Sequence, residues 1–161
     1  MEVAGALEEE APAATGNMKT HEFLSQLDEA GIVAEIAKAE SRTTGEIRVF
    51  VSRRTVNDPV PRAQERFEKL GMTRTQSRNG VLLYFAPRSH KFAVVGDTAI
   101  HEKCGPEFWT EVISEIRPHL QAKNFTAAVT HAIRKVGEML ARHFPQEGGD
   151  RDELSNEIAA D

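Results

Sequence analysis

The chain has 161 residues, of which 40% are hydrophobic and 28% are charged, and its formal net charge at pH 7 is −5. This composition is typical of one globular domain with enough apolar material for a core. Residues 1–17 contribute −4 and residues 145–161 contribute −5, which leaves +4 for residues 18–144. So weak a positive balance lacks the concentrated basic stripe of nucleic-acid-binding proteins, so we expect no nucleic-acid partner.

The single cysteine, Cys104, excludes an internal disulfide and a thiolate cluster for zinc, and it suits a reducing compartment. The first residues have neither the basic start nor the apolar stretch of a signal peptide, and no uncharged apolar run approaches the ~20 residues of a membrane span. We therefore expect a soluble, cytoplasmic protein without a membrane span.

The N-terminal part of the chain predicts a leader followed by a helix. Residues 1–17 combine Glu, Ala, Pro and Gly, and we expect them to form a disordered acidic leader. The stretch Ser25-Gln-Leu-Asp28 has the spacing of a capping box, with Asp in place of the usual Glu. The apolar spacing after it predicts an amphipathic helix that ends near Arg42.

A strand and a second helix are predicted next. Residues 46–52, EIRVFVS, alternate in strand fashion. Turn residues follow them, and Pro61 suits the first turn of a helix that runs to about Leu70. Gly71 is then predicted to cap the C-terminal end of this helix.

Residues 78–97, RNGVLLYFAPRSHKFAVVGD, predict a β-hairpin. The apolar runs 80–86 and 91–95 have strand length, and a Pro-containing turn too short for a crossover joins them. The two strands should therefore be antiparallel. Because the first run is continuously apolar, we expect both of its faces to be buried.

Two helices and a tail complete the predicted chain. Pro106 starts a helix that we expect to end around Pro118, and Asn124 caps a longer helix that Pro145 stops. The folded domain is thus predicted over residues 18–144. Residues 145–161 carry six acidic residues and one Arg, and we expect a flexible acidic tail.

The order of these elements favours an α/β fold. If the helix after Pro61 is a crossover, the first two strands are parallel in a right-handed unit, and helices cover both faces of the sheet. The hairpin then brings Gly80 opposite Asp97, and the first strand begins at the same end. Glu46, Asn79 and Asp97 should therefore converge at one edge of the sheet.

The converging residues allow two interpretations. Their carboxylate and amide oxygens are ligands that Ca²⁺ accepts, although calcium takes roughly six to eight oxygen ligands and this set is small. Alternatively, Asn79-Gly80 and Gly96-Asp97 are ordinary turn residues at strand ends, with Asp97 capping the next turn. Glu46, Asn79 and Asp97 are the candidate metal ligands.

The loop before Asn79 points to the opposite charge of ligand. Arg74-Thr-Gln-Ser-Arg78 offers two guanidinium groups and three polar side chains, which could hold a phosphate or a carboxylate. Arg74, Arg78, Asn79 and Gly80 are therefore the candidate anion-binding residues, and a solvated polar loop is the alternative. The histidines show no metal-ligand spacing, and the sequence contains no nucleophile motif, so no catalytic residue is assigned.

Three segments in order, AESRTTGEIRVFV, RNGVLLYFAPRSHKFAVVGD and NFTAAVTHAIRKVGEML, resemble the TPM domain family over roughly residues 25–142. The family includes thylakoid-lumen and photosystem-repair proteins and many bacterial proteins of unassigned role. The resemblance implies a three-layer α/β/α sandwich with a central mixed sheet, for which we expect three to four strands. It also implies calcium binding near the N-G-V-L-L segment and a phosphatase activity that has been proposed for some relatives.

The family pattern matches at Glu46, Asn79, Gly80 and Asp97, but the preceding loop differs. Many relatives carry acidic residues in this loop, whereas residues 73–78 here are Thr-Arg-Thr-Gln-Ser-Arg. We therefore predict an accessory TPM-like domain that binds a protein partner or a small anion at the strand ends. The alternative is a weak calcium-dependent phosphatase that uses Glu46, Asn79 and Asp97.

Overall fold

The computed structural model describes residues 3–10, 20–146 and 154–161, and of residues 3–10 only the backbone is considered. The elements, in chain order, are β1 (Val3–Glu10), α1 (Thr20–Ser25), α2 (Glu29–Glu40), β2 (Glu46–Val51), α3 (Pro59–Lys69), the 3₁₀ turn η1 (Met72–Arg74), β3 (Gly80–Ala86), the 3₁₀ turn η2 (Pro87–Ser89), β4 (Lys91–Asp97), α4 (Thr98–Cys104), α5 (Glu107–Gln121), α6 (Phe125–His143) and β5 (Ala159–Ala160).

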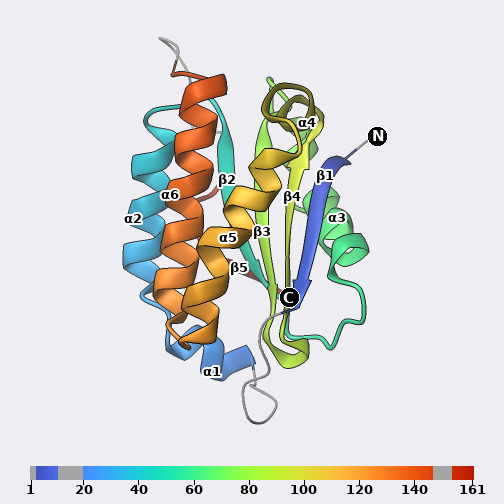
Figure 1. The fold of residues 1–161 in the computed structure, drawn as a ribbon, viewed down its shortest axis with the longest axis vertical. Helices are drawn as coiled ribbons and strands as arrows, with labels where there is room; N and C mark the ends of the chain where they lie inside the picture. The colour runs from blue at the N-terminus through green and yellow to red at the C-terminus, as the bar shows by residue number, and fades with distance from the viewer. Residues whose placement is uncertain (1–2, 11–19, 147–153) are drawn as a thin grey trace.

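The sheet has the strand order β1-β4-β3-β2-β5. Strand β2 is parallel to β3 and β5, whereas β4 is antiparallel to β3 and to β1. Helices α2, α5 and α6 cover one face, and α3 covers the other (Figure 1). The predicted α/β/α sandwich with a mixed sheet is confirmed, and the three predicted strands are β2, β3 and β4.

The register places the ends of three strands at the same end of the sheet. In the parallel pair, Glu46 lies beside Gly80, and in the hairpin Val81 lies beside Gly96. The first residues of β2 and β3 and the last residue of β4 therefore share one end of the sheet. At the level of the backbone, this is the convergence that the sequence predicts.

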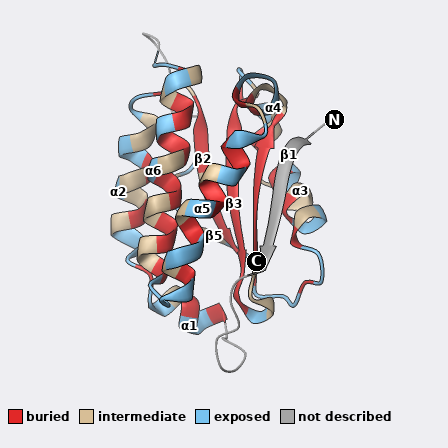
Figure 2. Ribbon diagram, viewed as in Figure 1, coloured by how far each residue is buried: buried red, intermediate tan, exposed pale blue. Residues whose placement is uncertain are grey.

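Alternation along the strands divides the core into two layers. Val81, Leu83 and Phe85 face the layer of α2, α5 and α6. Leu82 and Tyr84 face the layer of α3. All five side chains are buried, as predicted, because helices cover both faces (Figure 2).

Several predicted helix ends are confirmed, and one is wrong. Gly71 follows α3 with a φ of 73°, and Asn124 caps α6 by accepting a hydrogen bond from the backbone N–H of Ala127. Ser25, by contrast, is the last residue of the short helix α1 rather than a cap. Asp28 caps α2 and accepts from the backbone N–H of Gly31 at 3.0 Å. The polar pair at 25 and 28 thus serves two helices instead of one.

Helix α5 continues past Pro118 to Gln121, so the predicted end near Pro118 is wrong. A proline inside a helix removes one backbone donor and crowds the preceding turn. Ile116 and Leu120 lie on either side of it and are both buried in the core. Their burial keeps this helical turn in place despite the proline.

The two edge strands lie in segments for which the sequence predicted no regular structure. Strand β1 pairs with β4 from Val3–Asp97 to Glu10–Lys91, with an irregularity between Ala4 and Ala6. Strand β5 pairs Ala159 with Phe50 and Ala160 with Val51. A sheet edge offers free backbone donors and acceptors, and pairing with them requires no particular apolar pattern. The other residues of the predicted disordered leader and flexible tail, 1–2, 11–17 and 147–153, fall outside the described residues.

None of the helices in the described ranges is long and apolar enough to cross a membrane.

Candidate functional site at the end of the sheet

Glu46 on β2 and Asp97 on β4 lie at the same end of the sheet, with strand β3 between them. Strand alternation places both on the α3 side, because Phe50 of β2 and Val95 of β4 belong to the core layer of α3. With β3 between them, their backbones are separated by two strand spacings, or about 10 Å. Both residues are buried, Glu46 with 2% exposure and Asp97 with 0%.

Gly80 of β3 lies between these two acids in the sheet, is itself buried and is covered by its neighbours. A Cβ atom at Gly80 would lie 3.4 Å from the carbonyl oxygen of Met72 and 3.5 Å from Cζ of Phe67. The layer of α3 and η1 thus covers Gly80, so this predicted anion-binding residue is not available to a ligand from solvent.

Arg78 binds both carboxylate oxygens of Asp97. Its Nε donates to Oδ2 at 2.7 Å and its Nη2 donates to Oδ1 at 2.8 Å, a bidentate arrangement. The Asp97 side chain has no exposure, whereas 38% of the Arg78 side chain is exposed. Hydrogen bonding to Asp97 raises the pKa of Arg78, so the guanidinium stays charged.

Local backbone geometry positions this pair. Arg78 has a φ of 50°, in the left-handed region that non-glycine residues seldom adopt. Its carbonyl accepts a hydrogen bond from the backbone N–H of Ala99 at 3.2 Å, which ties the loop to α4. Asp97 also caps α4, accepting from the backbone N–H of Thr98 at 2.7 Å. The interpretation of Asp97 as a capping residue is therefore confirmed.

Asn79 belongs to a different set of contacts. Its Nδ2 donates to the hydroxyl of Thr44 at 3.0 Å, and its carbonyl accepts from the backbone N–H of Glu46 at 3.4 Å. Its Oδ1 is buried and has no hydrogen-bond partner. Strand alternation places Asn79 on the face opposite Glu46 and Asp97. The three predicted metal ligands thus share one end of the sheet but not one face.

The described arrangement does not form a joint calcium ligand set from Glu46, Asn79 and Asp97. Arg78 occupies both oxygens of Asp97, and the covered Gly80 separates Asp97 from Glu46. Within the part of the chain that the structure describes, no group of three or more His, Cys, Asp or Glu side chains is placed to hold a metal ion. Calcium binding stays a prediction.

Arg74 belongs to the same loop as Arg78. It ends the turn η1 and is exposed, whereas its neighbour Thr75 is buried. The loop from Gly71 to Gly80 carries Arg74 and Arg78 and no acidic residue. This loop therefore carries one guanidinium fixed by Asp97 and partly exposed, at Arg78, and one on an exposed residue, at Arg74.

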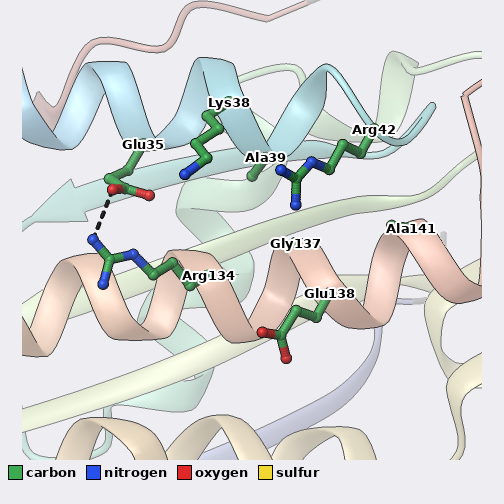
Figure 3. Close-up of a pocket in the computed structure, with 8 residues that line it drawn as sticks. All are labelled: Glu35, Lys38, Ala39, Arg42, Arg134, Gly137, Glu138 and Ala141. Atoms are coloured by element: carbon green, nitrogen blue, oxygen red, sulfur yellow. Dashed lines mark hydrogen bonds and ion pairs between the residues drawn. The ribbon is translucent and has the colours of Figure 1, made fainter.

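A hollow, which the sequence did not indicate, lies between α2 and α6 (Figure 3). Its volume is about 420 Å³, and it is lined by Glu35, Lys38, Ala39, Arg42, Arg134, Gly137, Glu138 and Ala141. Arg134 donates to Glu35 across the groove at 2.8 Å, and this hydrogen bond lowers the pKa of Glu35. The signal in the sequence is the pair of small residues Gly137 and Ala141, four positions apart on one helix face.

A mixed sheet between a layer of helices α2, α5 and α6 and the single helix α3 defines the class of the domain, an α/β/α sandwich. The TPM domain model matches residues 18–139, and the chain belongs to the TPM domain family. This confirms the resemblance seen in the sequence.

One similar solved structure is the NMR structure of the BA42 protein from the psychrophilic bacterium Bizionia argentinensis sp. nov.. It is 33% identical in sequence with a TM-score of 0.78, and the match covers 92% of this chain and 99% of that chain. No curated protein matches the chain.

Proposed function

We propose that this TPM domain acts by binding, and that the edge carrying Arg74 and Arg78 takes an anionic group, either a carboxylate of a partner protein or a small anion. The observation that carries the proposal is the bidentate pair with Asp97, which holds Arg78 in one orientation while 38% of its side chain is exposed. A guanidinium fixed in this way loses little conformational entropy when it binds an anion.

The two hydrogen bonds to Asp97 fix the orientation of the Arg78 guanidinium and therefore of its remaining N–H donors. Of the roughly five N–H donors of a guanidinium, Asp97 uses two, which leaves the others for a ligand. Arg74 adds a second positive charge from the exposed turn η1. The negative charge of Asp97 is already paired with Arg78, and the loop itself contains no acidic residue. The positive charge of Arg74 is therefore not balanced by an acid of this loop. The edge thus favours anions, with a modest affinity that salt weakens.

The alternative function is the calcium-dependent phosphatase. One observation favours it: Glu46 and Asp97 are buried carboxylates at the same end of the sheet. For a cation to bind Asp97, Arg78 would first have to leave it. We therefore rank this function second.

Amide chemical shifts recorded during titration with inorganic phosphate, sodium acetate and CaCl₂ test the proposal. We expect phosphate and acetate to shift amides of residues 71–80 with dissociation constants near a millimolar, on the order of −4 kcal/mol. Arg74→Gln and Arg78→Lys should each weaken this binding several-fold. Arg62→Gln is the matched control, because Arg62 is an exposed arginine on α3 outside this edge.

Two outcomes would overturn the proposal. The first is the absence of phosphate- or acetate-dependent shifts at residues 71–80. The second is calcium binding at micromolar affinity together with metal-dependent hydrolysis of a generic phosphomonoester that Asp97→Asn abolishes. The second outcome would replace the binding function by the phosphatase.

A further inference from the structure

At the far end of β2, away from Asp97, residues 154–161 lie along the edge of the sheet. Strand β5 pairs in parallel with Phe50 and Val51 (Figure 1). Leu154 and Ala159 pack against the core layer of α3, and Ile158 packs against the layer of α2, α5 and α6. The segment thus contacts β2 through its backbone and both core layers through small or aliphatic side chains.

The side chain of Asp161 enters a carboxylate-binding site at the end of β2. The hydroxyl of Ser52 donates to Oδ2 at 3.1 Å, and the backbone N–H of Arg53 donates to Oδ1 at 2.5 Å. The guanidinium groups of Arg54 and Arg66 lie 3.9 and 3.8 Å from Oδ2. Only 10% of the Asp161 side chain is exposed.

The groups that hold this carboxylate are positioned by the rest of the domain. Ser52 is buried, with 1% exposure, and its backbone is fixed on both sides: its N–H donates to Phe85 at 2.8 Å and its carbonyl accepts from Thr20 at 3.1 Å. The hydroxyl of Ser52 also accepts from the backbone N–H of Arg54 at 3.1 Å. Arg66 lies 5.3 Å over the ring of Phe50. None of these contacts involves residues 154–161, so they do not depend on the segment that occupies the site.

Residues 154–161 make few contacts with the rest of the domain. Two residues of β5 pair with β2, three side chains of the segment pack on the core layers, and one acidic side chain is bound. A peptide held by so few contacts stays in place largely because its tether keeps it near, an effective-concentration effect. The same contacts are available to an equivalent peptide from another chain.

We propose that the outer edge of β2, together with Ser52, Arg53, Arg54 and Arg66, is a peptide-binding site that the chain's own residues 154–161 occupy in cis. The ligand it fits is an extended segment of another protein with an aliphatic residue three positions before an acidic one, as in Ile158-Ala-Ala-Asp161. Backbone pairing along β2 provides affinity, and the acidic and aliphatic positions provide specificity. This site is at the opposite end of β2 from Arg78 and does not depend on the proposed anion site.

The test is binding of a fluorescein-labelled peptide, LSNEIAAD, to the full chain and to two variants of it. In the Asp161→Lys chain, the lysine meets Arg54 and Arg66, so the cis segment should leave β2 and the peptide should bind. We expect binding at least tenfold tighter than to the native chain, whose tethered segment competes. Glu157→Lys is the matched control: it makes the same charge change at an exposed position of the same segment and should bind like the native chain.

A second peptide, LSNEIAAK, tests recognition of the carboxylate. We expect it to bind the Asp161→Lys chain at least tenfold more weakly than LSNEIAAD does, since its lysine faces two arginines. Circular dichroism of each variant confirms that it is folded, and Ala160→Pro, which removes a backbone donor of β5, is a second way to release the segment.

Three outcomes would overturn the proposal. The first is no binding of LSNEIAAD to either released variant, up to about a millimolar of protein. The second is equal binding of the two peptides. The third is a native chain that is dimeric at micromolar concentration and becomes monomeric after Asp161→Lys, which would assign the edge of β2 to the segment of a second copy.

Discussion

The two ends of strand β2 each lie near an acidic side chain bound by arginine, but the two acids are attached to the fold in different ways. At one end, Asp97 is the last residue of the inner strand β4 and has no exposure. At the other end, Asp161 follows the two-residue edge strand β5. Similar chemistry therefore occurs once within the sheet and once at its margin.

The two acids differ in which strand pairings must break before the acidic residue can move out of its site. The backbone of Asp97 moves away from its site only if β4 separates from β3 and β1, which amounts to unfolding the sheet. Asp161 leaves Ser52 when only β5 opens. Local opening of this kind costs far less free energy than global unfolding. Asp97 is therefore held in place by the sheet itself, whereas the Asp161 site can exchange its occupant.

Hydrogen exchange should give the largest contrast between the two regions. Amides of β4 are expected to exchange only through global unfolding, which costs about 5–15 kcal/mol in typical domains. Amides of residues 158–161 should exchange through local opening and show protection lower by more than about a hundredfold. Peptide-resolved mass spectrometry measures both segments in one sample. Equal protection of the two segments would show that residues 158–161 do not open independently of β4.

Removal of Arg78 should be the most damaging substitution at either site. In Arg78→Ala, the buried carboxylate of Asp97 loses its bidentate partner. We expect the free energy of unfolding to fall by about 2–3 kcal/mol, less than for a fully buried pair because 38% of the Arg78 side chain is exposed.

Urea denaturation measures this change, with Arg74→Ala as the control. Arg74 is exposed in the same loop, and its removal should alter the free energy of unfolding by no more than about 0.5 kcal/mol. Equal effects of the two substitutions would show that the pair with Asp97 contributes nothing to stability.

Substitution of Asp161 should have a smaller effect on stability. Asp161→Asn keeps the shape of the side chain and removes its charge, so the bonds from Ser52 and Arg53 weaken at a site that opens locally. We expect the free energy of unfolding to fall by about 1 kcal/mol or less. The same urea series measures it, with Glu157→Gln as the control. A loss as large as that of Arg78→Ala would mean that β5 unfolds together with the whole sheet.

The smallest expected effect is a change in the pKa of Tyr84, the single tyrosine of the chain. Burial raises the pKa of Tyr84 above 10.0, and the charge of Asp161 raises it further. Asp161→Asn should therefore lower this pKa without returning it to the ordinary value, because burial remains. The absorbance of the phenolate follows the titration directly.

The sign of the associated pH dependence follows from the raised pKa. The contribution of neutral Tyr84 to stability is fully present below the unfolded pKa, near 10.0, and is lost as the pH rises through the folded pKa. Asp161→Asn lowers the upper limit of that range. An unchanged phenolate titration in the variant would indicate that Asp161 does not lie beside Tyr84 in solution.

Much of the inner sheet could be predicted because its signals are local. The continuous apolar run from Gly80 to Ala86 requires burial on both faces, and the short turn after it requires an antiparallel partner. Asp97 and Asn124 were interpreted as helix caps on local grounds, and the structure confirms both. The convergence of Glu46 and Asp97 at one end followed from strand direction alone.

The contacts within the site could not be predicted in the same way. That Arg78 binds both oxygens of Asp97 depends on a φ of 50° at Arg78 and on its bond to Ala99. That Glu46 and Asn79 face opposite sides depends on where regular alternation begins. Both features are set by side-chain and backbone geometry across the sheet, for which residue spacing carries no signal.

By itself, the sequence determined the α/β class, the hairpin, the helix caps and the family, because each of these depends on residue patterns within a short stretch of chain or on their order. Only the tertiary structure decided which acid meets which arginine and which segments complete the sheet. Strands β1 and β5 join its edges through backbone pairing, which any sequence free of proline can make. The site for Asp161 brings Ser52, Arg53, Arg54 and Arg66 against a residue more than ninety positions away, and packing of α3 on the sheet and pairing of β5 with β2 place them there.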